Sequence, residues 1–141
     1  MQKNKKNTIL VVDDEPDTRI FLRNLLSAEG LVPIIAENKT EGLMNALEKK
    51  PSVIIINMMM QDEQGIQMYH DLKVDNKIKH IPVIILSTLK RETFFKCHMI
   101  RHNRFEHKIP KPDDFLEKPL ETEELLKMVN KLVNMGRKDE I

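Results

Sequence analysis

Polar side chains suited to a metal ion and a phosphate stand at the ends of apolar runs in this sequence. Asp13 and Asp14 follow the first run, and Asn57 follows the third. Lys118 follows the fifth. Carboxylates, an amide oxygen and a backbone carbonyl are ligands that a hard cation such as Mg²⁺ accepts, and a lysine offers a phosphoryl oxygen a compact positive charge. If the runs are parallel neighbouring strands, these groups form one pocket with two carboxylates, one amide and one ammonium.

Each of these residue types also has a simpler role. An acidic pair is common in a solvated turn or a helix cap, and a lone lysine at a strand end is commonly exposed. Ser87 ends the fourth apolar run, and its hydroxyl suits either the same pocket or the N-cap of a following helix. The pocket interpretation is favoured because several polar strand ends occur together after apolar runs.

The apolar runs are continuous and rich in β-branched residues, which is typical of strands buried on both faces of a parallel sheet. Pro16 suits the first turn of a helix, and Asn38 followed by Glu41 resembles a capping box. The expected strands are residues 8–12, 31–36, 53–56, 82–86 and 113–117. Strands that alternate with helices predict a doubly wound α/β sheet, whose ligands bind beyond the carboxyl ends of the strands.

Apolar residues at helical spacing predict which helix faces pack against this sheet. The expected buried positions of the first two helices are Ile20, Phe21, Leu25 and Leu26, then Leu43, Met44 and Leu47. A third helix is expected from Gly65 through Leu72, and a last one over residues 122–133.

The composition is that of one globular domain. Of 141 residues, 40% are hydrophobic and 32% charged, and the net charge is +1, so no global field draws the chain to nucleic acid or a membrane. A single cysteine excludes an internal disulfide and favours a cytoplasmic setting. The polar start does not predict a signal peptide, and the apolar runs are too short to predict a membrane span. We expect a basic tail at residues 1–7, a domain at 8–135 and a tail at 136–141.

Taken together, these residues resemble the receiver domain of two-component response regulators over almost the whole chain. The acidic pair of the family falls on Asp13 and Asp14. The family's D-x-x-M-P-x-x-x-G pattern begins at Asn57, with Met60 in the methionine place and Gly65 eight residues after Asn57. The position of the phosphoacceptor aspartate is therefore occupied by Asn57.

The resemblance implies a CheY-like, flavodoxin-like (βα)5 fold with five parallel strands. It places the Mg²⁺ ligands at Asp13, Asp14, Asn57 and the backbone carbonyl of Met59. It places the phosphate-binding and switch positions at Ser87, Thr88, Phe115 and Lys118. It also implies a signalling module that is not an enzyme, with a histidine kinase or another signalling protein as partner, and a homodimer through the face of the fourth helix, fifth strand and last helix.

The sequence departs from the family at the phosphoacceptor. A receiver aspartate attacks phosphorus, whereas the neutral amide of Asn57 is a poor nucleophile and forms no stable acyl phosphate. The amide also removes one of three negative charges, so we expect weakened Mg²⁺ binding. Gln61 replaces the loop proline of the family. Thr88 stands where a small alanine is common, so its larger side chain narrows the approach to the pocket.

Asn57 has three interpretations. It is the natural residue of a phosphorylation-independent receiver, or an engineered substitution in a normal phosphoaccepting receiver, or a sign that another acid such as Asp62 accepts phosphate instead. Asp62 is the least favoured acceptor, because it lies five residues along a loop and has no built-in alignment with Lys118.

Residues 90–111 form a long basic segment. Its cationic residues are Lys90, Arg91, Lys96, Arg101, Arg104, Lys108 and Lys111, against two acids. Contact with nucleic-acid phosphates is one interpretation, but no recognition helix is evident and aromatics are few, which favours a solvated or partner-docking face. Cys97, His98, His102 and His107 do not match a standard zinc pattern, so we expect scattered surface histidines.

Overall fold

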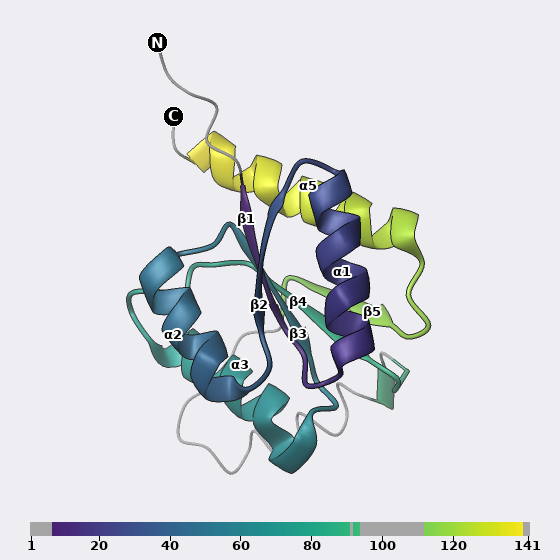
Figure 1. Ribbon diagram of the computed structural model, residues 1–141. Coiled ribbons are helices and arrows are strands. Elements are labelled where there is room, and N and C mark those ends of the chain that lie inside the picture. Colours follow the sequence, from purple (N-terminus) through teal and green to yellow (C-terminus); the bar gives the residue numbers. More distant parts are fainter. Residues whose placement is uncertain (1–6, 91, 94–111, 140–141) are drawn as a thin grey trace.

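The computed structural model describes residues 7–90, 92–93 and 112–139. A five-stranded sheet runs through the molecule in the order β2-β1-β3-β4-β5 (Figure 1), and its neighbouring strands are all parallel. The strands are β1 (Thr8–Val12), β2 (Val32–Ala36), β3 (Val53–Asn57), β4 (Val83–Ser87) and β5 (Asp114–Glu117). The predicted doubly wound sheet is confirmed, with each strand end within one residue of the expected one.

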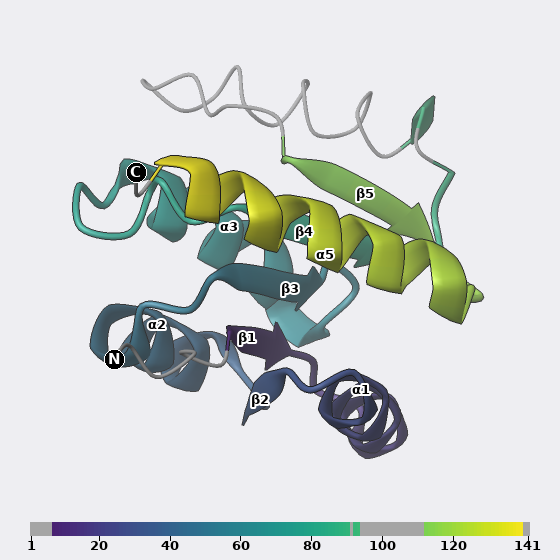
Figure 2. The ribbon, with the colours of Figure 1, turned by 90° about the horizontal axis from the view of Figure 1, so that it is seen from above.

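Helices cover both faces of the sheet (Figure 2). They are α1 (Pro16–Ala28), α2 (Lys39–Lys49), the short 3-10 turn η1 (Gln61–Glu63), α3 (Gln64–Val74) and α5 (Thr122–Asp139). Pro16 opens α1 as expected, and Asn38 Oδ1 caps α2 by accepting the Glu41 N–H at 2.9 Å. The last helix is longer than predicted, because its backbone remains helical beyond Val133.

The core has two halves because side chains alternate across a strand. Leu10 and Val12 of β1 point towards α2 and α3, whereas Ile9 and Val11 point towards α1 and α5. Strands β1, β3 and β4 are buried on both faces, which explains their uninterrupted apolar runs.

The predicted helix faces were partly wrong. Ile20 and Phe21 of α1 are 49% and 43% exposed, and Met44 and Leu47 of α2 are 55% and 40% exposed. On α2 the buried residues are instead small ones, Gly42 and Ala46. A Cβ on Gly42 would lie 2.7 Å from Met68 Cε, so α2 approaches its neighbours through the residues with the least side chain.

The basic segment lies largely outside the described residues, as do Cys97 and the three histidines near it. The predictions for nucleic-acid contact, zinc and a dimer face that includes this segment therefore stay predictions. Within the described ranges, no helix is long and apolar enough to cross a membrane.

Candidate functional site

Three buried polar side chains lie at the carboxyl edge of the sheet. Asp13, Asn57 and Ser87 are 1%, 2% and 0% exposed, and they are the buried polar residues among those described. They follow or end the three central strands β1, β3 and β4. The ladder continues to this edge, because Met58 N donates to Leu86 O at 2.9 Å. The prediction that these strand ends converge is confirmed.

The Asn57 side chain is held at both ends of its amide. Its Nδ2 donates to Asp13 Oδ1 at 3.1 Å, and its Oδ1 accepts the Met59 N–H at 3.1 Å. A flipped amide would set its oxygen against the Asp13 oxygen and its nitrogen against the Met59 N–H, so the two partners fix the orientation. Asn57 therefore presents a hydrogen-bond donor to Asp13.

Asp13 lies at the centre of the cluster. Its Oδ1 also accepts the Glu15 N–H at 2.9 Å, and Lys118 Nζ lies 3.9 Å from its Oδ2. Burial raises the pKa of the Asp13 carboxyl, although the Glu15 N–H, the Asn57 amide and the Lys118 ammonium each oppose that rise. Predicted neighbours Asp13, Asn57 and Lys118 are thus brought together.

Asp14 is half-buried next to Asp13 and makes a separate contact. Its Oδ2 accepts the main-chain N–H of Gln61 at 3.1 Å. The loop after β3 is therefore tied back to the end of β1, a link between residues 47 positions apart. The residue that makes this contact, Gln61, is the one that replaces the loop proline, and proline has no N–H to donate.

The other predicted switch residues lie around the cluster in different settings. Ser87 Oγ accepts the Leu89 N–H at 3.1 Å, and its carbonyl accepts the Lys118 N–H at 2.8 Å. Ser87 therefore holds the turn after β4 and joins it to the chain after β5. Thr88 is exposed, and Phe115 is buried in the half of the core that faces α2 and α3.

The loop after Asn57 is packed tightly against the next helix. Met59 is 51% exposed at the edge of the cluster, while Met58 and Met60 on either side are buried. A Cβ on Gly65 would lie 2.6 Å from Asn57 O and 2.8 Å from Met58 Cα. Only glycine allows α3 to begin this close to the end of β3.

The cluster fits a hard cation through its carboxylates. Asp13 Oδ2 is buried, and within the described part of the chain no donor lies within hydrogen-bonding distance of it. A buried carboxylate oxygen that accepts no hydrogen bond favours a positively charged partner, and the Lys118 ammonium at 3.9 Å meets that need only in part. Asn57 offers nitrogen on this side, and the described residues contain no group of three His, Cys, Asp or Glu side chains around one point. The roles of Asp13, Asp14, Asn57 and the Met59 carbonyl in holding Mg²⁺ stay predictions.

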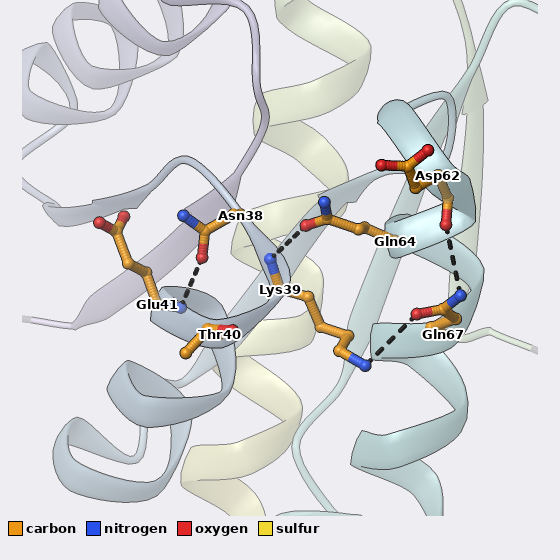
Figure 3. Close-up of a pocket in the computed structure, with 7 residues that line it drawn as sticks. All are labelled: Asn38, Lys39, Thr40, Glu41, Asp62, Gln64 and Gln67. Atoms are coloured by element: carbon orange, nitrogen blue, oxygen red, sulfur yellow. Dashed lines mark hydrogen bonds between the residues drawn. The ribbon is translucent and has the colours of Figure 1, made fainter.

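Asp62 lies outside the cluster. It lines a polar surface pocket of about 580 Å³ between the first turns of α2 and α3 (Figure 3). The other residues that line this pocket are Asn38, Lys39, Thr40, Glu41, Gln64 and Gln67. Lys39 links the two helices there, because its N–H donates to Gln64 Oε1 at 2.9 Å and its Nζ lies 3.5 Å from Asp71 Oδ2.

Arg19 is a contributor that the sequence analysis missed. Its Nη1 donates to the carbonyl oxygen of Asp13 at 2.8 Å, and its Nη2 lies 3.6 Å from Glu37 Oε2. Arg19 thus fixes the main chain of Asp13 from the first turn of α1. A single arginine on an amphipathic helix gives no sequence signal for this role, because most such residues are solvated.

Comparison with known proteins bears on the family and the fold of this chain. The sequence model of the response regulator receiver domain matches residues 9–130. Protein PilH of Pseudomonas aeruginosa is 33% identical over 122 residues, which cover 86% of this chain and 93% of PilH. Histidine kinase P4 of Formosa agariphila is 32% identical over 136 residues, which cover 96% of this chain but 9% of that kinase.

A solved structure is similar as well. The receiver domain of the Francisella response regulator 1452 is 28% identical and matches with a TM-score of 0.76, covering 93% of this chain and 99% of that domain. Receiver domains are in general signalling modules rather than enzymes, and they typically bind Mg²⁺ at the phosphorylation site. The matched residues and the shared fold show that the chain belongs to the response regulator receiver domain family of two-component signalling.

Proposed function

We propose that this domain is a pseudo-receiver, which acts in two-component signalling without accepting a phosphoryl group at Asn57. One observation supports this above all: the amide of Asn57 is buried at the phosphoacceptor position and both its ends are hydrogen-bonded. An amide there has no nucleophilic oxygen to offer, and its donor already serves the carboxylate of Asp13.

Signalling by such a domain depends on binding. A partner that prefers one conformation shifts the population towards it, with no covalent step. The proposed partner is a histidine kinase or another signalling protein in the cytoplasm. By binding this partner, the domain keeps it from phosphoaccepting receivers. The proposed cation is Mg²⁺, held by Asp13 and Asp14 more weakly than in a receiver with three carboxylates.

A second candidate is a normal phosphoaccepting receiver in which aspartate has been replaced by Asn57. The Lys118 ammonium, 3.9 Å from Asp13 Oδ2, favours this alternative, since that charge would also suit a phosphoryl group. The two candidates differ in whether restoring one carboxylate restores phosphoryl transfer.

The test is the intact mass of the full chain after incubation with Mg²⁺ and acetyl phosphate. It compares the unchanged protein, Asn57→Asp, and Asn57→Asp combined with Lys118→Ala. We expect no phosphoryl gain in the unchanged protein. A gain in Asn57→Asp that disappears without Lys118 would favour the second candidate.

No gain in any of the three proteins would favour a binding role that has lost the rest of the chemistry. A gain in the unchanged protein would overturn the proposal. Asp62→Asn then identifies whether Asp62 is the acceptor, since that substitution alone would abolish the gain.

A further inference from the structure

Gln61, in the loop after β3, contacts Asp14 of the acidic pair. Its main-chain N–H donates to Asp14 Oδ2 at 3.1 Å, while its side chain is exposed. The contribution of Gln61 to the site is therefore its backbone donor. A hydrogen bond to an ionised carboxylate is stronger than one between neutral groups.

The loop that carries this donor is held in an unusual conformation. Asp62 and Glu63 have φ values of 55° and 58°, in the left-handed region that residues other than glycine rarely adopt. Gln67 Nε2 donates to the Asp62 carbonyl at 3.3 Å and secures the turn. Strained residues of this kind persist where their surroundings hold them, and the Gln61–Asp14 bond anchors the residue directly before this pair.

The same carboxylate is a proposed ligand of Mg²⁺. A cation and an N–H group compete for carboxylate lone pairs, and the Gln61 bond takes one lone pair of Asp14 Oδ2 and restrains the direction of the carboxylate. We propose that the Gln61 main-chain N–H competes with a divalent cation for Asp14, which makes Gln61 a determinant of cation affinity. This inference rests on the proposed function only in taking Asp14 as a cation ligand.

Proline at position 61 removes the donor without an evident clash. Proline has no N–H, and it requires an extended residue before it. Met60 already has φ −71° and ψ 160°, and residue 61 begins a helical turn, where proline is tolerated. Gln61→Pro is therefore the informative variant, and Gln61→Ala is its matched control because alanine keeps the N–H and loses only the exposed side chain.

The experiment is calorimetric titration of the full chain with Mg²⁺ alone. It compares both Gln61 variants with the unchanged protein, and repeats the pair with Asn57→Asp, where the added carboxylate raises the affinity. We expect Gln61→Pro to bind Mg²⁺ about tenfold more tightly than Gln61→Ala, the size expected when a competing charged hydrogen bond is removed. Equal affinities of the two variants in both backgrounds would overturn the inference, as would binding to neither.

A second measurement needs no change at Gln61. Amide hydrogen exchange of Gln61 is compared with and without saturating Mg²⁺ in the Asn57→Asp protein. Faster exchange with Mg²⁺ is expected, because the N–H loses its partner, and unchanged exchange at saturation would overturn the inference. Neither readout depends on phosphoryl transfer, so the inference and the proposed function can fail separately.

Discussion

At the scale of single residues, the decisive contact is the one between Asn57 and Asp13. The amide supplies a donor at 3.1 Å to a carboxylate that is 1% exposed. An aspartate at position 57 would instead set a second buried negative charge against the first. Two carboxylates at this distance cannot both remain ionised without a cation or a large energetic penalty.

Asn57→Asp should therefore make the fold depend on a cation. With EDTA present, we expect the free energy of unfolding to fall by about 3 kcal/mol, the loss typical of an uncompensated buried charge. Mg²⁺ should restore much of it, because a bound cation stabilises the folded state by mass action. Urea unfolding with EDTA and with Mg²⁺ measures both effects.

Asn57→Ala is the control for this measurement, since it removes the donor and adds no charge. Its stability should respond little to Mg²⁺. An Asn57→Asp protein with the same stability in EDTA and in Mg²⁺ would contradict the expected repulsion.

The positions of these residues could be predicted from the sequence, but their contacts could not. Asp13, Asn57 and Ser87 were found because parallel strands end at one edge of the sheet. The direction of the Asn57 amide depends on the Met59 N–H, which comes from loop geometry. The Arg19 and Gln61 contacts likewise arise from the paths of α1 and the loop after β3, which no motif encodes.

At the scale of elements, the start of α3 is fixed by the close approach of Gly65 to the end of β3. The nearest atoms to an added Cβ are Asn57 O, Met58 Cα and Met58 O, all in the main chain. Main-chain atoms of a central strand cannot move aside without disturbing the ladder. Gly42 provides the contrast, because its nearest contacts are the flexible tip of Met68.

Gly65→Ala should consequently be much more harmful than Gly42→Ala. We expect a loss of about 2–3 kcal/mol in the free energy of unfolding for Gly65→Ala, in the range of overpacked sites. For Gly42→Ala the expected loss is about 1 kcal/mol or less, because Met68 can shift and alanine favours the helix. Urea unfolding of the two variants tests this order, and equal losses would show that the loop after Asn57 yields easily.

The helices also show where periodicity misleads. Apolar spacing predicted Met44 and Leu47 as buried on α2, whereas Gly42 and Ala46 form its buried face. A prediction from hydrophobicity alone ranks large apolar side chains as the most buried. The narrow gaps that separate α2 from α3 and from β1 leave space only for small side chains. The packing of the whole sheet sets the width of these gaps.

At the scale of the whole molecule, the amino edge of the sheet has its own polar junction. Lys73 Nζ donates to Lys79 O and Ile81 O, each at 3.2 Å, and lies 3.9 Å from Asp113 Oδ2. That carboxylate also accepts the Val83 N–H at 2.8 Å. The Lys73 side chain is 7% exposed, so one lysine joins the end of α3 to the starts of β4 and β5.

Lys73→Met should destabilise the domain by about 1–3 kcal/mol at pH 7, because the carbonyl oxygens lose their donor. Burial lowers the pKa of Lys73, although the Asp113 carboxylate opposes this. Between that lowered pKa and the unfolded value of about 10.4, the unfolded chain binds more protons. The stabilisation by Lys73 should therefore increase as pH rises through this window.

Urea unfolding of the unchanged protein and Lys73→Met from neutral to alkaline pH measures the difference directly. A difference that shrinks with rising pH would contradict the sign. Mg²⁺ affinity should be the same in both proteins, because the junction lies at the edge of the sheet opposite Asp13 and distant sites behave independently.

The architecture was the most predictable level, for a physical reason. Strands buried on both faces need continuous apolar runs, so β1, β3 and β4 stand out in the sequence. The spatial order β2-β1-β3-β4-β5 leaves no comparable local pattern, and the prediction from sequence went no further than a flavodoxin-like fold, which came from resemblance to a family.

The hydrogen bond from Met58 N to Leu86 O also bears on how this protein ages. Asparagine turns spontaneously into aspartate and isoaspartate when the next main-chain nitrogen attacks the side-chain carbonyl carbon and expels ammonia, after which water opens the ring at either carbonyl. At Asn57 that nitrogen belongs to Met58 and is engaged in the sheet, while Asp13 and Met59 hold the amide. Folding thus protects Asn57 from the slow chemistry that would otherwise install a carboxylate in the pocket of older molecules.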